Sequence, residues 1–514
     1  MINLAIRPSR RRAVAAHMVM GAILQAVFAV QSLVILPLCV RTIGTETFGF
    51  WLATGGILSW LAVVNFGSAG LTMQRCAAAY GRNDLQAVRD WYMHGLVMSA
   101  VSAALLLALL LPVAAFAPGW LGATGDVAAV LSAGMVIAGC GAALSPLNDT
   151  ARGFVCALQR NGLAVGAEVV AAVASLAFTV WALLSGWGIM GLAWGSLARL
   201  SLALLVNAGV AAIYVTRVAP RTRWSPAIIG EYGRTLLPLC ASSVVSQVIP
   251  QLPLVVLAKG LGPEAGPVAS LAYTATTRAI SLAEMFTMHA ISSTSSAISH
   301  LVEDHRAADT SPVRIRSMSA AVYAAIAAGV ALYCLGDEGF VSLWVGRDAF
   351  LGQPFVFAAA MASFALIQLR WLMNLGTSLG MVTHIAMFQS GEGVLRAIAM
   401  VGGMVMLGPI GIPACAAIVM VAASAVIERR LSEHPAFPTG GTGRLGWLLR
   451  AAVACGVACL AARTVEAGSW MSWVISMAVG ALVVMVALVA GSPDVRHLFN
   501  VLRTRRHVVQ QPVA

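Results

Sequence analysis

Long apolar runs alternate along the chain with short breaks that carry arginine, glycine or proline. Each run is long enough for about 20 residues of helix, which is the length that crosses a hydrocarbon core about 30 Å thick. The pattern therefore predicts an all-α polytopic membrane protein. It crosses the membrane about fourteen times, near 13–39, 47–72, 91–115, 127–147, 164–185, 189–215, 235–257, 266–297, 317–336, 353–373, 384–407, 412–427, 446–463 and 469–490.

Composition supports this interpretation. Of 514 residues, 59% are hydrophobic and 10% are charged, with a mean hydropathy of +0.86, whereas about a quarter of the residues in soluble domains are charged. These values exclude a soluble enzyme, a disordered chain and a secreted disulfide scaffold. The first run, Ala13 to Val40, is much longer than the 7–15 apolar residues of a signal peptide, so we interpret it as a membrane helix.

The charges predict the topology. The net charge is +12, and lysine occurs only at Lys259, so almost every basic residue is an arginine. The arginines gather at the N-terminus, in every second break and in the tail, and Arg370 belongs to that series. Because cytoplasmic loops carry the excess of basic residues, both termini are predicted to be cytoplasmic. The basic tail 492–514 fits either a helix on the inner leaflet or a solvated end, and nothing indicates binding to nucleic acid.

An internal repeat predicts the architecture. Residues 34–54 align with residues 253–274, so that Gly44 matches Gly262 at an offset of about 218 residues. Six spans separate the copies, an even number, so the two halves have the same orientation. We expect two pseudo-symmetric six-helix lobes and a C-terminal helix pair. Their predicted bounds are 1–216 for the first lobe, 217–233 for a cytoplasmic linker, 234–430 for the second lobe and 446–491 for the pair.

The repeated segment also carries a family resemblance. The motif L-P-L-x-x-R-x-I-G-x-E-x-F-G at 36–49, the segment N-F-G-S-A-G-L at 65–71 and the basic loop ending Y-G-R-N-D at 80–84 resemble the polysaccharide-transporter branch of the multidrug/oligosaccharidyl-lipid/polysaccharide (MOP) flippase superfamily. The resemblance implies a MATE-like fold with a V-shaped central cavity and alternating access. It further implies transport of undecaprenyl-diphosphate-linked oligosaccharide across the bacterial inner membrane, alongside polymerase and other polysaccharide-assembly proteins.

Three arginines fall near the middle of predicted spans: Arg199, Arg278 and Arg396. Ionisable residues at bilayer depth are costly and usually functional, so these guanidinium groups are candidates for binding the diphosphate of a lipid carrier. The alternative is a structural ion pair or snorkelling to the interface. Glu392 lies four residues before Arg396 and can neutralise it, whereas Glu284 cannot face Arg278 on one helix.

Polar residues supplement these candidates. His289 follows Arg278 by eleven residues and returns to its helix face, while Gln31 and Gln247 bring amides into the first and seventh spans. We assign these three residues, with the three arginines, to substrate binding. Glu284 and Glu392 are assigned to modulating or ion-coupling roles.

Three further functions remain open. A drug-extruding antiporter would favour unpaired carboxylates for cationic substrates, and a polytopic glycosyltransferase or polymerase would need a large outer loop. A scaffold subunit would not require arginines at depth. No catalytic residue, metal site or cofactor is expected, because no ATP-binding motif occurs and Cys455 and Cys459 have no nearby histidine. The energy would then come from a coupling cation, H⁺ or Na⁺, or from removal of the product on the far side of the membrane.

Overall fold

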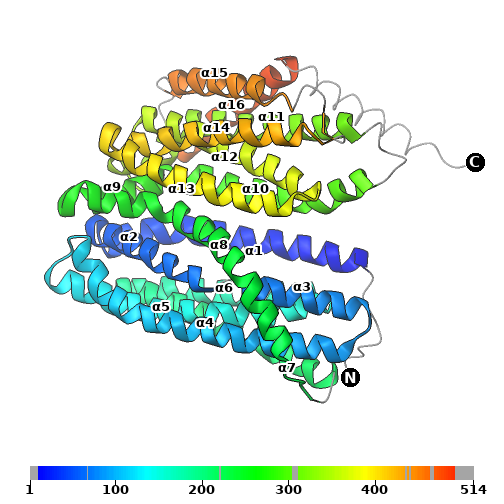
Figure 1. Ribbon diagram of the computed structural model, residues 1–514. Helices are drawn as coiled ribbons and strands as arrows, with labels where there is room; N and C mark the ends of the chain where they lie inside the picture. The colour runs from blue at the N-terminus through cyan, green and yellow to red at the C-terminus, as the bar shows by residue number, and fades with distance from the viewer. Residues whose placement is uncertain are drawn as a thin grey trace, which may run out of the picture. The chain divides into compact units, whose positions relative to one another are not determined.

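The protein is described here by a computed structural model, which covers residues 10–65, 67–218, 221–303, 311–434, 437–438, 442–462 and 468–491. Within these ranges the chain forms sixteen α-helices and no strand (Figure 1). Ten helical stretches in the described part are long and apolar enough to cross a membrane. The predicted all-α, multi-pass membrane fold is confirmed.

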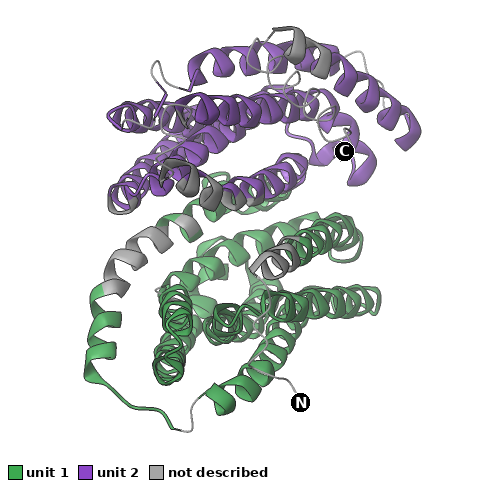
Figure 2. Ribbon diagram, turned by 90° about the vertical axis from the view of Figure 1, so that its right-hand side faces the viewer, with its two compact units in different colours: residues 1–271 green, residues 272–514 purple. Residues whose placement is uncertain are grey.

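The chain divides into two compact units, residues 1–271 and 272–514, which Figure 2 colours separately. The first unit contains α1 (Arg10–Thr42), α2 (Thr45–Leu61), α3 (Ser68–Gly81), α4 (Leu85–Trp120), α5 (Gly125–Ala157), α6 (Asn161–Leu184), α7 (Ile189–Val218), α8 (Pro226–Gly260) and most of α9 (Gly262–Thr276). The second contains α10 (Arg278–Glu303), α11 (Ser311–Trp344), α12 (Gln353–Ser378), α13 (Val382–Leu407), α14 (Gly411–Leu431), α15 (Arg444–Ala462) and α16 (Trp470–Gly491).

Two predicted spans are each divided into two helices. The second span consists of α2, a short 3₁₀ turn (Ala62–Asn65) and α3, and Gly67 before α3 has φ 69°, a value that favours glycine. The eighth span consists of α9 and α10, separated by Thr277, whose hydroxyl donates to the Tyr273 carbonyl at 2.7 Å. Such a bond competes with helix geometry and bends helices. At the offset of about 218 residues, Thr277 corresponds to position 59, a few residues before the interruption of the second span, so the two repeats are interrupted at nearby but different positions.

Small residues allow close helix packing inside each unit. A Cβ atom on Gly195 of α7 would lie 2.0 Å from the Thr179 hydroxyl of α6. A Cβ on Gly403 of α13 would lie 2.2 Å from the Gly411 carbonyl of α14. These contacts are typical of membrane helices, whose backbones approach where side chains are small.

Polar side chains of α4 bind the segment that leads into α8. The Asp90 carboxylate accepts from the Arg223 backbone N–H at 2.7 Å, and His94 Nε2 accepts from the Ser225 N–H at 3.1 Å. His94 Nδ1 donates to the Asp90 carbonyl at 2.7 Å, which fixes the tautomer. Asp90 and His94 are buried, where hydrogen bonds are stronger than at a solvent-exposed surface, so these bonds hold the linker in place.

The first part of α8 and its far end both contact the first unit. Near its start, Tyr232 exchanges a hydrogen bond with Thr72 at 2.6 Å. Toward its end, the indole of Trp60 donates to the Val248 carbonyl at 3.2 Å. These contacts explain why α8 belongs to the compact unit 1–271. The predicted lobe boundaries stay a prediction, because close packing and membrane lobes need not divide at the same residue.

Candidate functional site

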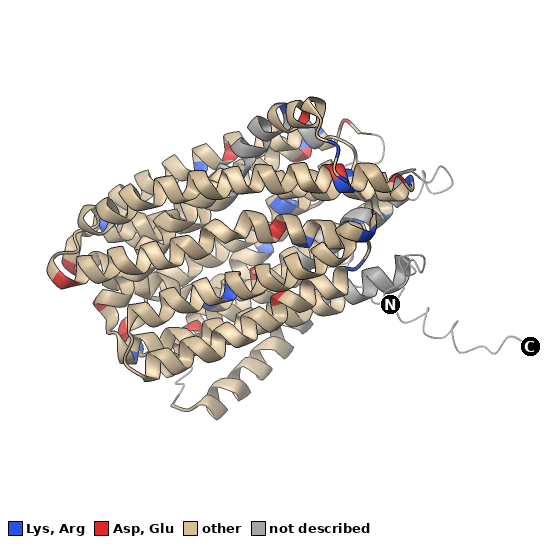
Figure 3. Cartoon of the chain, turned by 90° about the horizontal axis from the view of Figure 1, so that it is seen from below, with Lys and Arg blue, Asp and Glu red and all other residues tan. Residues whose placement is uncertain are grey.

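Charged residues are sparse along the helices, and several lie away from the helix ends (Figure 3). In the described part of the second unit, α10, α11, α12 and α13 all carry charged residues inside the helix. Burying a charge is expensive unless it is paired and hydrogen-bonded. A charged group with an ion pair or hydrogen bonds is therefore interpreted as structural, and one without such partners as available to a ligand.

Arg396 and Glu392 form a buried ion pair within α13. Their Nε and Oε1 atoms lie 3.1 Å apart, with side chains 8% and 2% exposed. A second guanidinium nitrogen of Arg396 lies 3.3 Å from the sulfur of Met420. The i, i+4 pairing expected from the sequence is present in the structure. Because Glu392 neutralises Arg396 on its own helix, the structural interpretation of Arg396 gains support.

Two more charged groups extend this pair into a network. The charge of Arg370 on α12 acts on Glu392, and the charge of Arg396 acts on Glu284 of α10. Glu284 also accepts a hydrogen bond from Ser363 of α12. Two arginines and two glutamates thus balance each other across three helices. Charges that balance each other stabilise helix packing more readily than they bind an anion.

Arg278 differs from Arg396. It is the first residue of α10, directly after the interruption at Thr277, and is half-buried. Its Nε atom is buried with no hydrogen-bond partner, and no ion pair involves Arg278 among the described residues. The predicted mismatch with Glu284 agrees with the structure, in which Glu284 bonds to Ser363 instead. Arg278 is therefore a guanidinium with unused donor capacity at a helix break.

In the first unit, Arg199 lies beside α1. Its guanidinium carbon is 5.7 Å from the ring centre of Phe28, a cation–π distance, and no carboxylate within the described ranges forms an ion pair with it. Gln31 lies three residues beyond Phe28 and is half-buried. The structure thus brings Arg199 and the Gln31 region to adjoining helices. Gln247 is exposed on α8, and no hydrogen bond of its side chain is recorded in the described part.

The side chain of His289 lies outside the described residues, so its predicted position on the face of Arg278 stays a prediction. The basic tail 492–514 also lies outside the described residues. Among the described residues, no group of three or more His, Cys, Asp or Glu could hold a metal ion.

Glu168 is a second buried carboxylate of the first unit, besides Asp90, and it is partnered. Glu168 of α6 accepts from the Asn148 amide at 2.7 Å and lies 3.5 Å from the Asn207 amide nitrogen. Asn207 in turn donates to Asn148 at 2.9 Å. Side chains from α5, α6 and α7 therefore form one buried polar cluster, as expected for a structural group that fixes helix packing.

The sequence did not predict the roles of three residues in the second unit. Arg370 was expected on the cytoplasmic side within the predicted span 353–373, but the sequence contained no sign that its charge acts on Glu392 of another helix. Ser363 gave no signal because its partner Glu284 is distant in sequence. Asp337 lies just beyond the predicted span 317–336, yet α11 extends to Trp344 and Asp337 is 1% exposed, with neither carboxylate oxygen hydrogen-bonded to a described residue. A helix longer than hydropathy predicts would have included Asp337.

Comparisons with solved structures identify the fold. An inward-facing multidrug resistance MATE family transporter of the MOP superfamily has a TM-score of 0.61 at 15% identity, covering 78% of this chain and 95% of that one. The lipid II flippase MurJ in an inward closed conformation has a TM-score of 0.67 at 10% identity, covering 93% of this chain and 99% of that one. An outward-facing MATE transporter of the same superfamily has a TM-score of 0.58 at 15% identity, covering 83% and 97%.

Sequence comparisons add no closer relative. No family model matches the chain, and no curated protein matches it. The chain therefore has the fold of MOP superfamily transporters along most of its length. At these identities the likeness concerns the fold, and transporters with different substrates share it.

Proposed function

We propose that the protein is a flippase that moves undecaprenyl-diphosphate-linked oligosaccharide across the bacterial inner membrane by alternating access. The observation that carries this proposal is the contrast among the deep arginines. Arg396 is neutralised by Glu392, whereas Arg199 and Arg278 have no ion pair among the described residues. Guanidinium groups with free donors suit a diphosphate, which they bind bidentately.

The fold is compatible with transport of a lipid-linked substrate, and also with transport of drugs. One structural neighbour is described as a lipid II flippase, and others are described as multidrug transporters. The choice between them depends on the sign of the free charge. A cationic drug would require free carboxylates, but Glu168, Glu284 and Glu392 all have hydrogen-bond or ion-pair partners, and Asp337 is the exception among the buried carboxylates named here. The described charges therefore favour an anionic substrate.

One carboxylate favours a second role, that of coupling to a cation. Asp337 is buried in α11 with no hydrogen bond to either oxygen among the described residues. A lone buried carboxylate is costly as an anion, so it suits a group that takes up a proton during transport. We propose H⁺ as the coupling cation, with Asp337 as a candidate beside Glu284 and Glu392.

A reconstituted system tests the proposal. The purified protein in vesicles should increase the rate at which a labelled undecaprenyl-diphosphate oligosaccharide becomes accessible in the opposite leaflet, compared with empty vesicles. The same vesicles should not accumulate a cationic dye under a proton gradient. Dye transport without lipid transfer would establish the antiporter instead. In bacterial cells, loss of the protein should stop export of one polysaccharide, an O-antigen, capsule or exopolysaccharide. The polysaccharide that is lost would identify the pathway and the assembly proteins that act with this one.

A further inference from the structure

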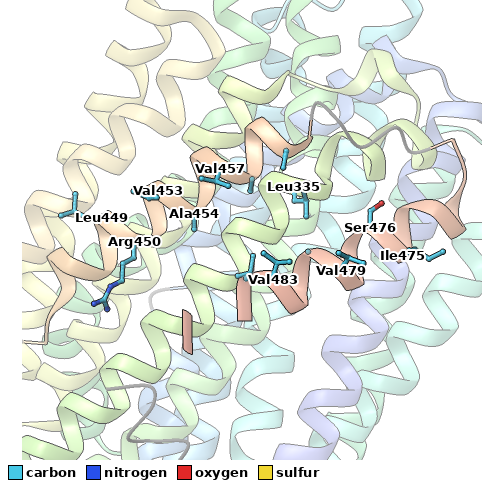
Figure 4. Close-up of a pocket in the computed structure, with 14 residues that line it drawn as sticks. Leu335, Leu449, Arg450, Val453, Ala454, Val457, Ile475, Ser476, Val479 and Val483 are labelled. Carbon is cyan, nitrogen blue, oxygen red and sulfur yellow. The ribbon is translucent and has the colours of Figure 1, made fainter. Parts of the chain in front are cut away.

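The C-terminal helices leave an open groove between them. The groove has a volume of about 820 Å³, and fourteen residues of α11, α15 and α16 line it (Figure 4). Leu335 of α11 lies between the two helices, Val453 and Val457 line one wall, and Val479 and Val483 line the other. Only Arg450 and Ser476 bring polar groups, and the Ser476 hydroxyl already donates to the Ser472 carbonyl at 2.9 Å.

The groove exists because α15 and α16 each pack on α11. Met477 of α16 contacts Gly336, where an added Cβ would lie 2.2 Å from its sulfur. The indole of Trp473 donates to the Gly336 carbonyl at 2.8 Å. On the other side, α15 packs along α11, and Cys334 of α11 and Cys455 of α15 are both fully buried. These contacts fix both helices to α11.

A groove of this kind is filled by hydrocarbon in a membrane. Its walls offer almost no polar partner, so water inside it would lose hydrogen bonds, and an empty groove would lose dispersion contacts. An acyl chain in the groove touches protein on several sides, whereas a chain on a convex helix touches it on one. The groove therefore selects hydrocarbon from the surrounding bilayer.

Arg450 gives the groove a charged end. Its side chain is exposed, its guanidinium lies 5.0 Å from the ring centre of Trp447, and no carboxylate in the described part pairs with it. By the predicted topology this end of α15 faces the cytoplasm. Basic pockets between membrane helices on that side bind anionic lipid head groups.

The length of the groove matches one leaflet. From Arg450 to Ala461, the lining of α15 extends for about 17 Å at 1.5 Å per residue. Half of a hydrocarbon core about 30 Å thick is about 15 Å. An acyl chain anchored at Arg450 would therefore end where the groove ends, whereas a much longer polyisoprenoid chain would leave it.

We propose that this groove is a binding site for an anionic phospholipid, with the phosphate at Arg450 and the acyl chains along α15 and α16. The site goes beyond the proposed transport function, because its occupant stays with the protein and is not carried. Its role is to fill the space between α15 and α16, each of which packs on α11.

Native mass spectrometry of the full-length protein tests this site. The protein is reconstituted in vesicles with equal amounts of phosphatidylglycerol and phosphatidylethanolamine, extracted in mild detergent, and its retained lipids are counted. We expect preferential retention of phosphatidylglycerol. Arg450→Gln should lower that retention about fivefold, the effect of one basic residue near an anionic lipid surface. Val457→Trp should abolish it by occupying the groove.

Matched controls separate this result from general charge or bulk. Arg429→Gln removes another exposed arginine, and Leu460→Trp adds an indole to an exposed position of α15 outside the lining. Both should retain phosphatidylglycerol as the unmodified protein does. Equal retention of the two phospholipids, or equal effects of Arg450→Gln and Arg429→Gln, would overturn the proposal. So would a polyisoprenyl diphosphate found in place of the phospholipid. Lipid transfer in vesicles is measured separately and tests the flippase function alone.

Discussion

Replacing Arg278 gives the sharpest test of the cationic substrate site. Arg278 begins α10, about 24 Å along the axis from Gly262 at the start of α9, at 1.5 Å per residue. Its buried Nε has no hydrogen-bond partner among the described residues. The free protein therefore carries the desolvation cost of this group without a compensating bond, which a bound diphosphate would supply.

The size of the effect follows from this difference. Removing one partner of a buried charge pair costs about 2–5 kcal/mol, or about 30-fold to several thousandfold in binding. Arg278→Lys should rescue poorly, because an ammonium group cannot bind bidentately. Neither change leaves an unpaired acid, so the amount of protein in the membrane should stay normal.

Two measurements check this prediction. Lipid transfer in vesicles should fall at least 30-fold for Arg278→Ala, while quantitative immunoblotting of membranes shows an unchanged level. Arg347→Ala is the matched control, because Arg347 is 83% exposed and should have no effect on transfer. Normal transfer by Arg278→Ala would refute the site, and loss of the protein would indicate a structural role instead.

The remaining predictions concern stability, coupling and topology. Arg396→Met should lower the membrane level of the protein, because Glu392 would stay buried without its partner at a cost of about 3–5 kcal/mol, and the double change with Glu392→Leu should restore it. If the double change is no better than the single one, the pair is not the reason for the loss. Asp337→Asn should fold normally yet make lipid transfer independent of a proton gradient, and an unchanged gradient dependence would exclude Asp337 as the coupling group. Reporter fusions after Arg223 should report the cytoplasm and those after Gly262 the outside, with a reversed result at Gly262 contradicting the repeat.

The sequence was sufficient for features with a local cause. The apolar runs predict where the helices lie, because the thickness of the bilayer sets the length of a membrane helix. The Arg396–Glu392 pair was predictable because it lies within one helix at i, i+4. The helix break at Thr277 was not predicted, since a single threonine inside an apolar run gives no clear signal.

Contacts between residues far apart in the chain could not be predicted from the sequence. Ser363 and Glu284 meet across two helices, and no spacing rule relates positions so far apart. Asp337 fell outside the predicted span 317–336 because α11 continues beyond the apolar segment that predicts it, and the charge that acts on Arg370 belongs to another helix. Charged residues near a predicted boundary therefore need the structure before they are assigned to water or to protein.

The polar bonds that join α4 to the linker have a mechanical consequence. Asp90 and His94 hold the residues before α8, and Trp60 holds the carbonyl of Val248 farther along that helix. Hydrogen bonds therefore hold this segment of the chain at two places, before α8 and within it. Any movement of α8 relative to α4 would have to break these hydrogen bonds, so adding a few glycines to the linker should not free α8 while Asp90 and His94 are present.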